Sequence, residues 1–152
     1  LEIFGQRIMK SERSDVSDFY DFWEIDTQKT EDKFYMLAYT QGLSPTDNFE
    51  FLADFNPTKS TSFLTDLANL GRLKLPVGSI CPGDVLTYQL EPLNVHDDKA
   101  VKVFKDGVEV GYIKKVHSRV FYKKKNRPFK LIVKAVEGNG QIKRVFVKVS
   151  FM

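Results

Sequence analysis

Apolar and polar residues alternate through much of the chain after Arg72, and this period of two predicts short β-strands. In the first of these strands Leu86, Tyr88 and Leu90 share one face. Asp106-Gly107 is a two-residue hairpin signal between two of the later strands. The expected strands cover residues 86–90, 100–104, 108–113, 129–136 and 142–151. Five strands with short turns predict a small, strongly bent sheet or a barrel.

The region before Arg72 carries apolar residues at helical spacing instead. Ser44-Pro45 suits the start of one helix, and a second helix is expected to end at Gly71 in the left-handed conformation. Together they predict an α-hairpin over residues 44–71, preceded by an aromatic-rich strand at 34–40. The hairpin holds four acids against one lysine, so it would repel phosphate, and we do not expect a DNA-reading helix-turn-helix.

These elements predict a mainly β protein of the α+β class with two regions. Residues 1–71 form an acidic N-terminal extension with one strand and the α-hairpin. Residues 72–152 form a β-domain of five to six strands with short helices, and the basic segment 114–127 is expected to be part helix and part loop. The length of 152 residues and the 42% hydrophobic content suffice for a buried core. The aromatic cluster at 19–23 is expected to plug that core.

The net charge of +3 conceals a strong division along the sequence. Residues 1–97 carry 8 basic and 16 acidic side chains, whereas residues 98–152 carry 15 basic and 4 acidic ones. This division predicts a basic surface in the second half that meets phosphate groups. The alternative is that the lysines only keep exposed strand edges soluble.

Several short motifs follow one another in a fixed order over residues 82–115. They are Pro82-Gly83-Asp84, Glu91-Pro92-Leu93-Asn94-Val95-His96-Asp97, Ala100-Val101-Lys102-Val103 and Gly111-Tyr112-Ile113-Lys114-Lys115. This order resembles the HIRAN domain family, which has Glu-Pro-x-Asn-(Pro)-(Tyr or His)-Asp, then Ala-Ile/Val-x-Val and Gly-Tyr-Ile/Leu. Several elements in order are more specific than one short motif. The match covers about a fifth of the chain and leaves residues 1–75 unexplained.

The resemblance implies a compact β-barrel with short helices that binds DNA. Domains of this family occur alone in bacteria and phages, or fused to helicase and nuclease modules. The best-understood members bind the 3′ end of a single DNA strand. The resemblance therefore implies DNA, single-stranded or 3′-ended, as the partner, with a helicase or nuclease as a further partner and a role in DNA repair.

The resemblance also implies which residues of this chain contact the ligand. His96 would fill the aromatic position of the family's loop, and Asp97 would supply the carboxylate beside it. Tyr112 and Lys115 would fall on positions where the family has DNA-contacting residues. Val95 departs from the pattern, because proline is common at that place, so this loop is expected to be less rigid.

The chemistry of these side chains fits a single-stranded ligand with a free end. Asp97 would repel an internal phosphate, yet it can accept a hydrogen bond from a terminal sugar hydroxyl. His96 and Tyr112 could each stack on an unpaired base, a contact worth about 1–3 kcal/mol per base. The cations expected to contact the strand backbone are Lys114, Lys115, Arg119, Lys123, Lys124, Lys125 and Arg127.

Simpler roles compete with each assignment. Asn94 joins the candidate nucleic-acid-binding residues, but asparagine and aspartate are frequent turn formers, and we favour a bond from Asn94 to its own loop backbone. Tyr112 on an alternating strand could belong to the core. The lysine run at 123–125 is typical of a solvated surface.

No motif for catalysis is present. The chain lacks a phosphate loop, a Gly-x-Ser-x-Gly elbow and a His-Glu-x-x-His helix, and its single cysteine, Cys81, has no base nearby in sequence. Cys81, His96 and His117 show no zinc-type spacing. We therefore expect a binding module without a catalytic site, cofactor or metal.

Two other functions stay open at this point. One is a protein-interaction adaptor in which the acidic half meets a helicase or nuclease partner. The other is a metal-dependent nuclease that uses Asp97-Asp98. The single cysteine and the absence of a signal peptide or of an apolar run of about 18–20 residues predict a cytoplasmic protein without a membrane partner.

Overall fold

The computed structural model describes residues 7–8, 13–43, 50, 53–57, 61–123 and 128–151. The chain divides into two compact units, Leu1–Ala53 and Asp54–Met152. No helix in the described part of the chain is long and apolar enough to cross a membrane.

The N-terminal unit is helical where it is described. It contains α2 (Val16–Trp23), the short 3-10 helix η1 (Thr27–Lys29) and α3 (Lys33–Thr40). Trp23, from the predicted aromatic cluster, is buried, and so are Met36 and Leu37 of α3. These apolar side chains form the core of the unit.

The strand predicted at residues 34–40 is wrong, because this segment is helix α3. Asp32 caps the helix: its carboxylate accepts the N–H groups of Phe34 and Tyr35, both at 3.0 Å. The prediction followed the high strand propensity of aromatic residues, which an N-terminal cap and the burial of one helix face override here.

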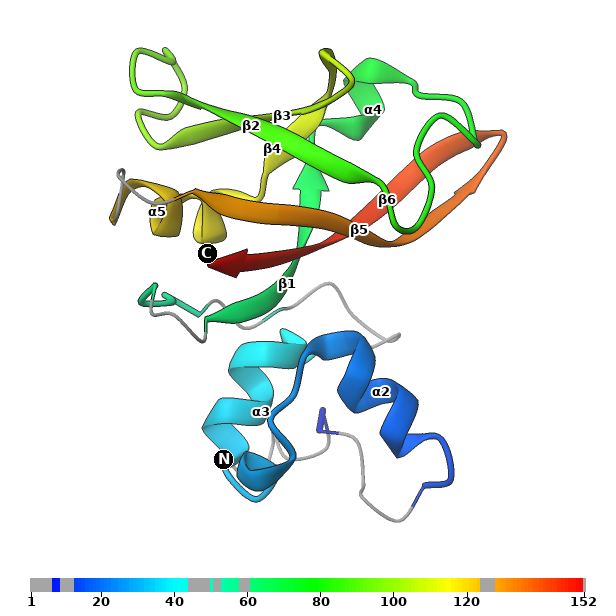
Figure 1. The fold of residues 1–152 in the computed structure, drawn as a ribbon, viewed down its shortest axis with the longest axis vertical. Coiled ribbons are helices and arrows are strands. Elements are labelled where there is room, and N and C mark those ends of the chain that lie inside the picture. Colours follow the sequence, from blue (N-terminus) through cyan, green and yellow to red (C-terminus); the bar gives the residue numbers. More distant parts are fainter. Residues whose placement is uncertain are drawn as a thin grey trace. The chain divides into compact units, whose positions relative to one another are not determined.

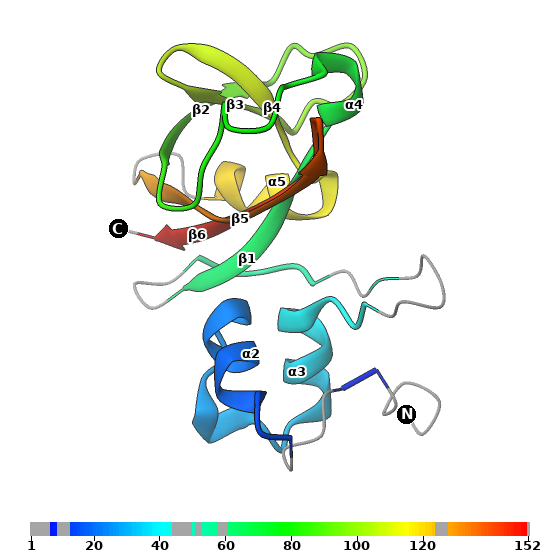
Figure 2. The same cartoon turned by 90° about the vertical axis from the view of Figure 1, so that its right-hand side faces the viewer.

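The second unit is a closed antiparallel barrel of six strands in the order β1-β4-β3-β2-β5-β6. The strands are β1 (Ser62–Ala68), β2 (Val85–Glu91), β3 (Ala100–Lys105), β4 (Val108–Ile113), β5 (Phe129–Asn139) and β6 (Gln141–Phe151). The helices are α4 (Leu70–Leu73) and α5 (Lys115–Lys123). Figures 1 and 2 show α5 between the β2–β3–β4 strands and the β5–β6 hairpin. The predicted mainly β fold of five to six strands is confirmed.

Alternating apolar residues fill the barrel interior, as period-two strands require. Val101 and Val103 of β3 and Val147 of β6 are fully buried. At Gly111, with φ of 136°, a Cβ would lie 2.8 Å from the carbonyl oxygen of Ala68. Glycine therefore allows β4 to approach β1 closely, immediately before the tyrosine of the predicted site.

The second helix of the predicted α-hairpin is wrong, because residues 62–68 form strand β1. The apolar positions of this segment fit the helical period and the strand period equally well. Strand pairing decides between them, because β1 closes the barrel by hydrogen bonding to β6 and β4, with Thr65 opposite Val147. Gly71 lies inside α4, and Asn69 and Lys74 take the left-handed conformation instead. Most of the first predicted helix, 44–49 and 51–52, lies outside the described residues.

The boundary between the units also differs from the predicted one. It falls between residues 53 and 54 rather than between 71 and 72. The reason is again β1, which is an integral strand of the barrel and cannot belong to an N-terminal extension.

Candidate nucleic-acid interface

Helix α5 presents three basic side chains in a row. Lys115, Arg119 and Lys123 follow one another at four-residue spacing, which places them on one face about 6 Å apart along the axis. The opposite face buries Val120 and Phe121 in the barrel. All three basic residues are exposed, and neither Lys115 nor Arg119 has an ion-pair partner among the described residues. We call these three residues the cation row.

The loop between β2 and β3, residues 92–99, faces α5 and is fixed by Asn94. The Oδ1 atom of Asn94 accepts the backbone N–H of His96 at 3.0 Å and that of Asp97 at 3.2 Å. Its Nδ2 atom donates to Oε2 of Glu91 at 3.0 Å. With donor and acceptor both engaged, Asn94 shapes the 92–99 loop, which is the simpler of the two roles considered from the sequence.

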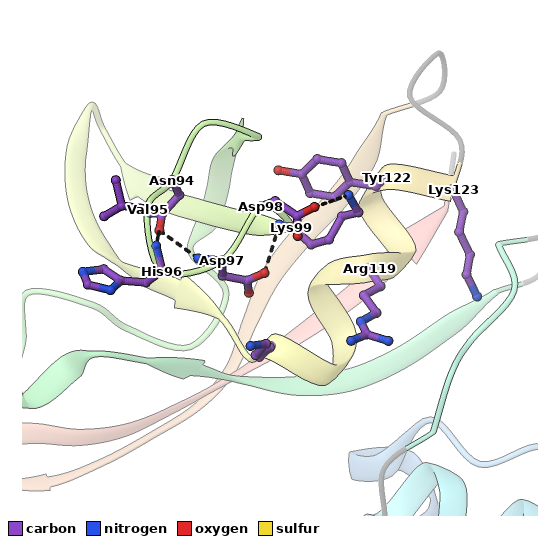
Figure 3. Close-up of a pocket in the computed structure, with 10 residues that line it drawn as sticks. Asn94, Val95, His96, Asp97, Asp98, Lys99, Arg119, Tyr122 and Lys123 are labelled. Atoms are coloured by element: carbon purple, nitrogen blue, oxygen red, sulfur yellow. Dashed lines mark hydrogen bonds and ion pairs between the residues drawn. The ribbon is translucent and has the colours of Figure 1, made fainter.

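Asp97 and His96 lie next to each other in this loop but differ in their surroundings. Oδ1 of Asp97 accepts the N–H of Lys99 at 2.9 Å, and the second carboxylate oxygen has no hydrogen-bond partner in the described part of the chain. The His96 side chain is exposed, and Figure 3 shows its ring extending away from Tyr122. One carboxylate oxygen and one imidazole ring are thus available to a ligand.

The 92–99 loop and α5 line an open hollow of about 680 Å³, within the range of small-ligand sites. Six of the predicted site residues line it: Asn94, His96, Asp97, Lys115, Arg119 and Lys123. The remaining lining residues are Val95, Asp98, Lys99 and Tyr122. We call it the basic hollow, because four of its ionisable side chains are cationic and two are anionic (Figure 3).

Two lining residues, Tyr122 and Lys99, were not expected from the sequence. The hydroxyl of Tyr122 donates to the carbonyl oxygen of Ala100 at 2.8 Å, and Nζ of Lys99 lies 5.3 Å from the centroid of its ring. Burial raises the pKa of the Tyr122 hydroxyl. The signal that could have identified Tyr122 is its position three residues after Arg119 on an amphipathic helix.

Tyr112 does not line the basic hollow. Its hydroxyl donates to Oε2 of Glu91 at 3.0 Å, and Nζ of Lys102 lies 2.6 Å from the other oxygen of Glu91. The bonds from Lys102 and then from Asn94 lower the pKa of the Glu91 carboxyl, and Glu91 in turn raises the pKa of Lys102. Tyr112 is therefore linked to the 92–99 loop by a shared hydrogen-bond acceptor, Glu91. Direct contact between Tyr112 and a ligand stays a prediction.

Of the remaining predicted cations only Lys114 is described, and it does not line the hollow. Lys114 forms an ion pair with Asp66 at 2.9 Å. Lys124, Lys125 and Arg127 lie outside the described residues. No group of three or more His, Cys, Asp or Glu side chains that could hold a metal ion occurs in the described segments.

His117, on the buried face of α5, is 1% exposed, and its Nδ1 atom lies 2.7 Å from Oγ1 of Thr65. Burial, with a smaller effect of the Lys114 ammonium, lowers the pKa of His117 to about 4. The two histidines of the chain thus have different environments: His96 faces solvent, and His117 belongs to the core.

Comparisons with known proteins relate the barrel to one family. The family model of the HIRAN domain matches residues 60–149, a stretch that includes β1, the 92–99 loop and α5. A crystal structure of the HIRAN domain of human HLTF is 20% identical, with a TM-score of 0.47, over 59% of this chain and 74% of that chain. A protein from Lactobacillus plantarum is 14% identical, with a TM-score of 0.44, over 57% and 91%. No curated protein matches the chain.

Proposed function

The chain belongs to the HIRAN domain family through residues 60–149, and from this we propose that its barrel binds nucleic acid, with single-stranded DNA or a DNA 3′ end as the ligand. The observation that carries the proposal is the basic hollow, where the cation row of α5 faces His96 and Asp97 of the 92–99 loop. The family relation supports nucleic acid as the class of ligand. The basic hollow supports the proposal that the ligand binds there.

The cation row provides the attraction to the strand backbone. Lys115 and Arg119 are exposed and have no ion-pair partner among the described residues, so a phosphate can approach them without breaking an existing bond. Contacts of this kind release counterions and make affinity depend on salt rather than on sequence. The row therefore supports binding of a nucleic-acid strand of any sequence, with its backbone lying along α5.

Asp97 supports a preference for a strand end. A carboxylate among four cations weakens the attraction to phosphate, unless it accepts a hydrogen bond from the ligand. The oxygen of Asp97 that Lys99 does not use can accept from a terminal sugar hydroxyl. A strand that ends in phosphate would bring two negative charges together at this position.

His96 and Tyr122 support contacts to unpaired bases. Both residues line the hollow, and aromatic rings stack on bases irrespective of sequence. Stacking requires exposed base faces, which a single strand offers and a continuous duplex does not. We propose that the module acts by binding alone; a helicase or nuclease partner remains a prediction.

Fluorescence anisotropy with a labelled single strand of about 12 nucleotides tests the proposal, since this length lies in the usual range of one barrel site. We expect binding at low salt, with higher affinity for a free 3′ hydroxyl than for a 3′ phosphate. Absence of binding at low salt would disprove nucleic-acid recognition. Equal affinity for both ends would remove only the end preference, and strand cleavage with Mg²⁺ or Mn²⁺ would contradict a purely binding role.

A further inference from the structure

The last cation of the row is already surrounded by oxygen atoms of its own unit. Nζ of Lys123 lies 2.6 Å from Oδ1 of Asp54, 3.0 Å from the carbonyl oxygen of Phe55 and 3.2 Å from Oδ1 of Asn56. Lys115 and Arg119 have no comparable partner among the described residues. Two cations of the row, Lys115 and Arg119, are therefore accessible to a ligand, and the third, Lys123, is paired with the Asp54 carboxylate.

The segment that supplies these oxygens is held in place independently of Lys123. The Phe55 ring stacks on Phe63 of β1, with centroids 4.3 Å apart and planes 13° from parallel. Oγ1 of Thr61 donates to the carbonyl oxygen of Asn56 at 3.0 Å, and Pro57 is buried. The carboxylate of Asp54 is therefore presented at the end of the row by contacts that do not depend on the charge of Lys123.

The ion pair itself is exchangeable. The Asp54 side chain is 71% exposed and that of Lys123 is 31% exposed. Exposed ion pairs contribute little to stability, so another anion can replace the carboxylate at small cost. A strand that already contacts Lys115 and Arg119 would bring its next phosphate toward this position, because the three cations are evenly spaced.

We propose that Asp54 occupies the position of a ligand phosphate, so that its carboxylate gates the far end of the cation row. This inference rests on the proposed function. Short strands that reach only Lys115 and Arg119 bind without displacing Asp54, whereas longer strands must displace it. Asp54 is the first residue of its unit and follows the N-terminal unit directly in the chain. The length of the bound strand therefore determines whether the Asp54 carboxylate keeps its contact with Lys123.

The test compares the wild-type chain with Asp54→Asn, Lys123→Gln and the double variant, using single strands of about 4 and about 12 nucleotides. Asparagine keeps the size of the side chain but removes its charge. We expect Asp54→Asn to bind the longer strand about two- to fivefold more tightly. The slope of log affinity against log salt should be about 0.7 shallower for Lys123→Gln than for Asp54→Asn with that strand, because Lys123→Gln loses one phosphate contact. Affinity for the short strand should not change.

Two further comparisons decide whether the effect is local. In the Lys123→Gln background, Asp54→Asn should have no effect on either strand, because the cation that it releases is absent. The matched control is Asp98→Asn, which removes an exposed acid that lines the hollow and is paired with Lys99. This control should tighten both strands to a similar degree.

Three outcomes would overturn the inference while the proposed function stands. They are an unchanged affinity of Asp54→Asn for the longer strand, equal tightening for both lengths, and tightening that persists with Lys123→Gln. A wild-type chain that binds neither strand at low salt would instead overturn the proposed function, and the inference with it.

Discussion

Tyr112 donates a hydrogen bond from its hydroxyl to Oε2 of Glu91 at 3.0 Å, and the same oxygen accepts from Asn94. Strand β4 is thereby connected through one carboxylate to the loop that carries His96 and Asp97. The sequence predicts that Tyr112 stacks on a base, and this bond gives it a second candidate role, which is to support the 92–99 loop.

The variant Tyr112→Phe separates the two roles, because it keeps the ring and removes the hydroxyl. If Tyr112 supports the 92–99 loop, the free energy of unfolding should fall by about 1 kcal/mol, and affinity for a free 3′ end should fall severalfold. Urea denaturation and anisotropy measure the two effects. Unchanged affinity would favour direct stacking by the ring.

The variant Asp97→Asn tests recognition of the strand end. An amide keeps an oxygen for the N–H of Lys99, so the loop should retain its shape. It loses the charge that strengthens the bond to a terminal hydroxyl, and such bonds contribute about 1.5–3 kcal/mol. The preference for a 3′ hydroxyl over a 3′ phosphate should therefore fall at least about tenfold. A preference that is retained would show that another group reads the end.

The variants Lys115→Gln and Arg119→Gln test the cation row. Each should weaken binding to the same extent for all sequences and reduce the salt slope by about 0.7, the value for one phosphate contact on a single strand. Lys130→Gln is the matched control, because Lys130 is exposed on β5 outside the basic hollow. An equal effect of Lys130→Gln would indicate a response to net charge rather than to a defined site.

The buried His117 predicts how stability depends on pH. Its pKa is about 4 in the folded chain against 6.5 when unperturbed, so the unfolded chain binds more protons between these values. The free energy of unfolding should therefore be highest above pH 6.5 and fall as the pH decreases toward 4, by about 3 kcal/mol in total. Urea denaturation at several pH values measures the effect.

Two histidine variants identify the source of that pH dependence. In His117→Gln the fall between neutral pH and pH 5 should largely disappear, although this variant is less stable at neutral pH. In His96→Gln the fall should persist, because His96 is exposed. The reverse result would assign the pH dependence to the ligand loop.

The sequence predicted the strands whose partners are close along the chain. Strands β2 to β6 follow from alternation and from turn residues such as Asp106-Gly107, and these are local signals. Strand β1 could not be predicted in this way, because its apolar residues also fit a helix and its partner β6 lies about 80 residues further along the chain. The aromatic residues of α3 fit a strand equally well, and the local signal for the helix is the capping carboxylate of Asp32.

For the candidate site, the order of motifs predicted His96, Asp97 and Lys115, and the charge of the second half predicted Arg119 and Lys123. The structure brings these five residues together in one hollow. The direction of each side chain could not be predicted. Tyr112 turns to Glu91, while Tyr122 lines the hollow because α5 continues to Lys123. The contact of Asp54 with Lys123 joins residues 69 positions apart, and no local pattern indicates it.

The pairing of β1 with β6 has a consequence for the synthesis of the chain. Ser62 of β1 lies opposite Ser150 of β6. The first barrel strand to be synthesised, β1, therefore cannot pair along this edge until the last one, β6, has been made. Until then one edge of β1 carries unpaired N–H and C=O groups, and the apolar face of β1 lacks its neighbour across the barrel. The nascent chain is therefore most prone to aggregation during this interval, and a closed barrel forms only after β6 has left the ribosome.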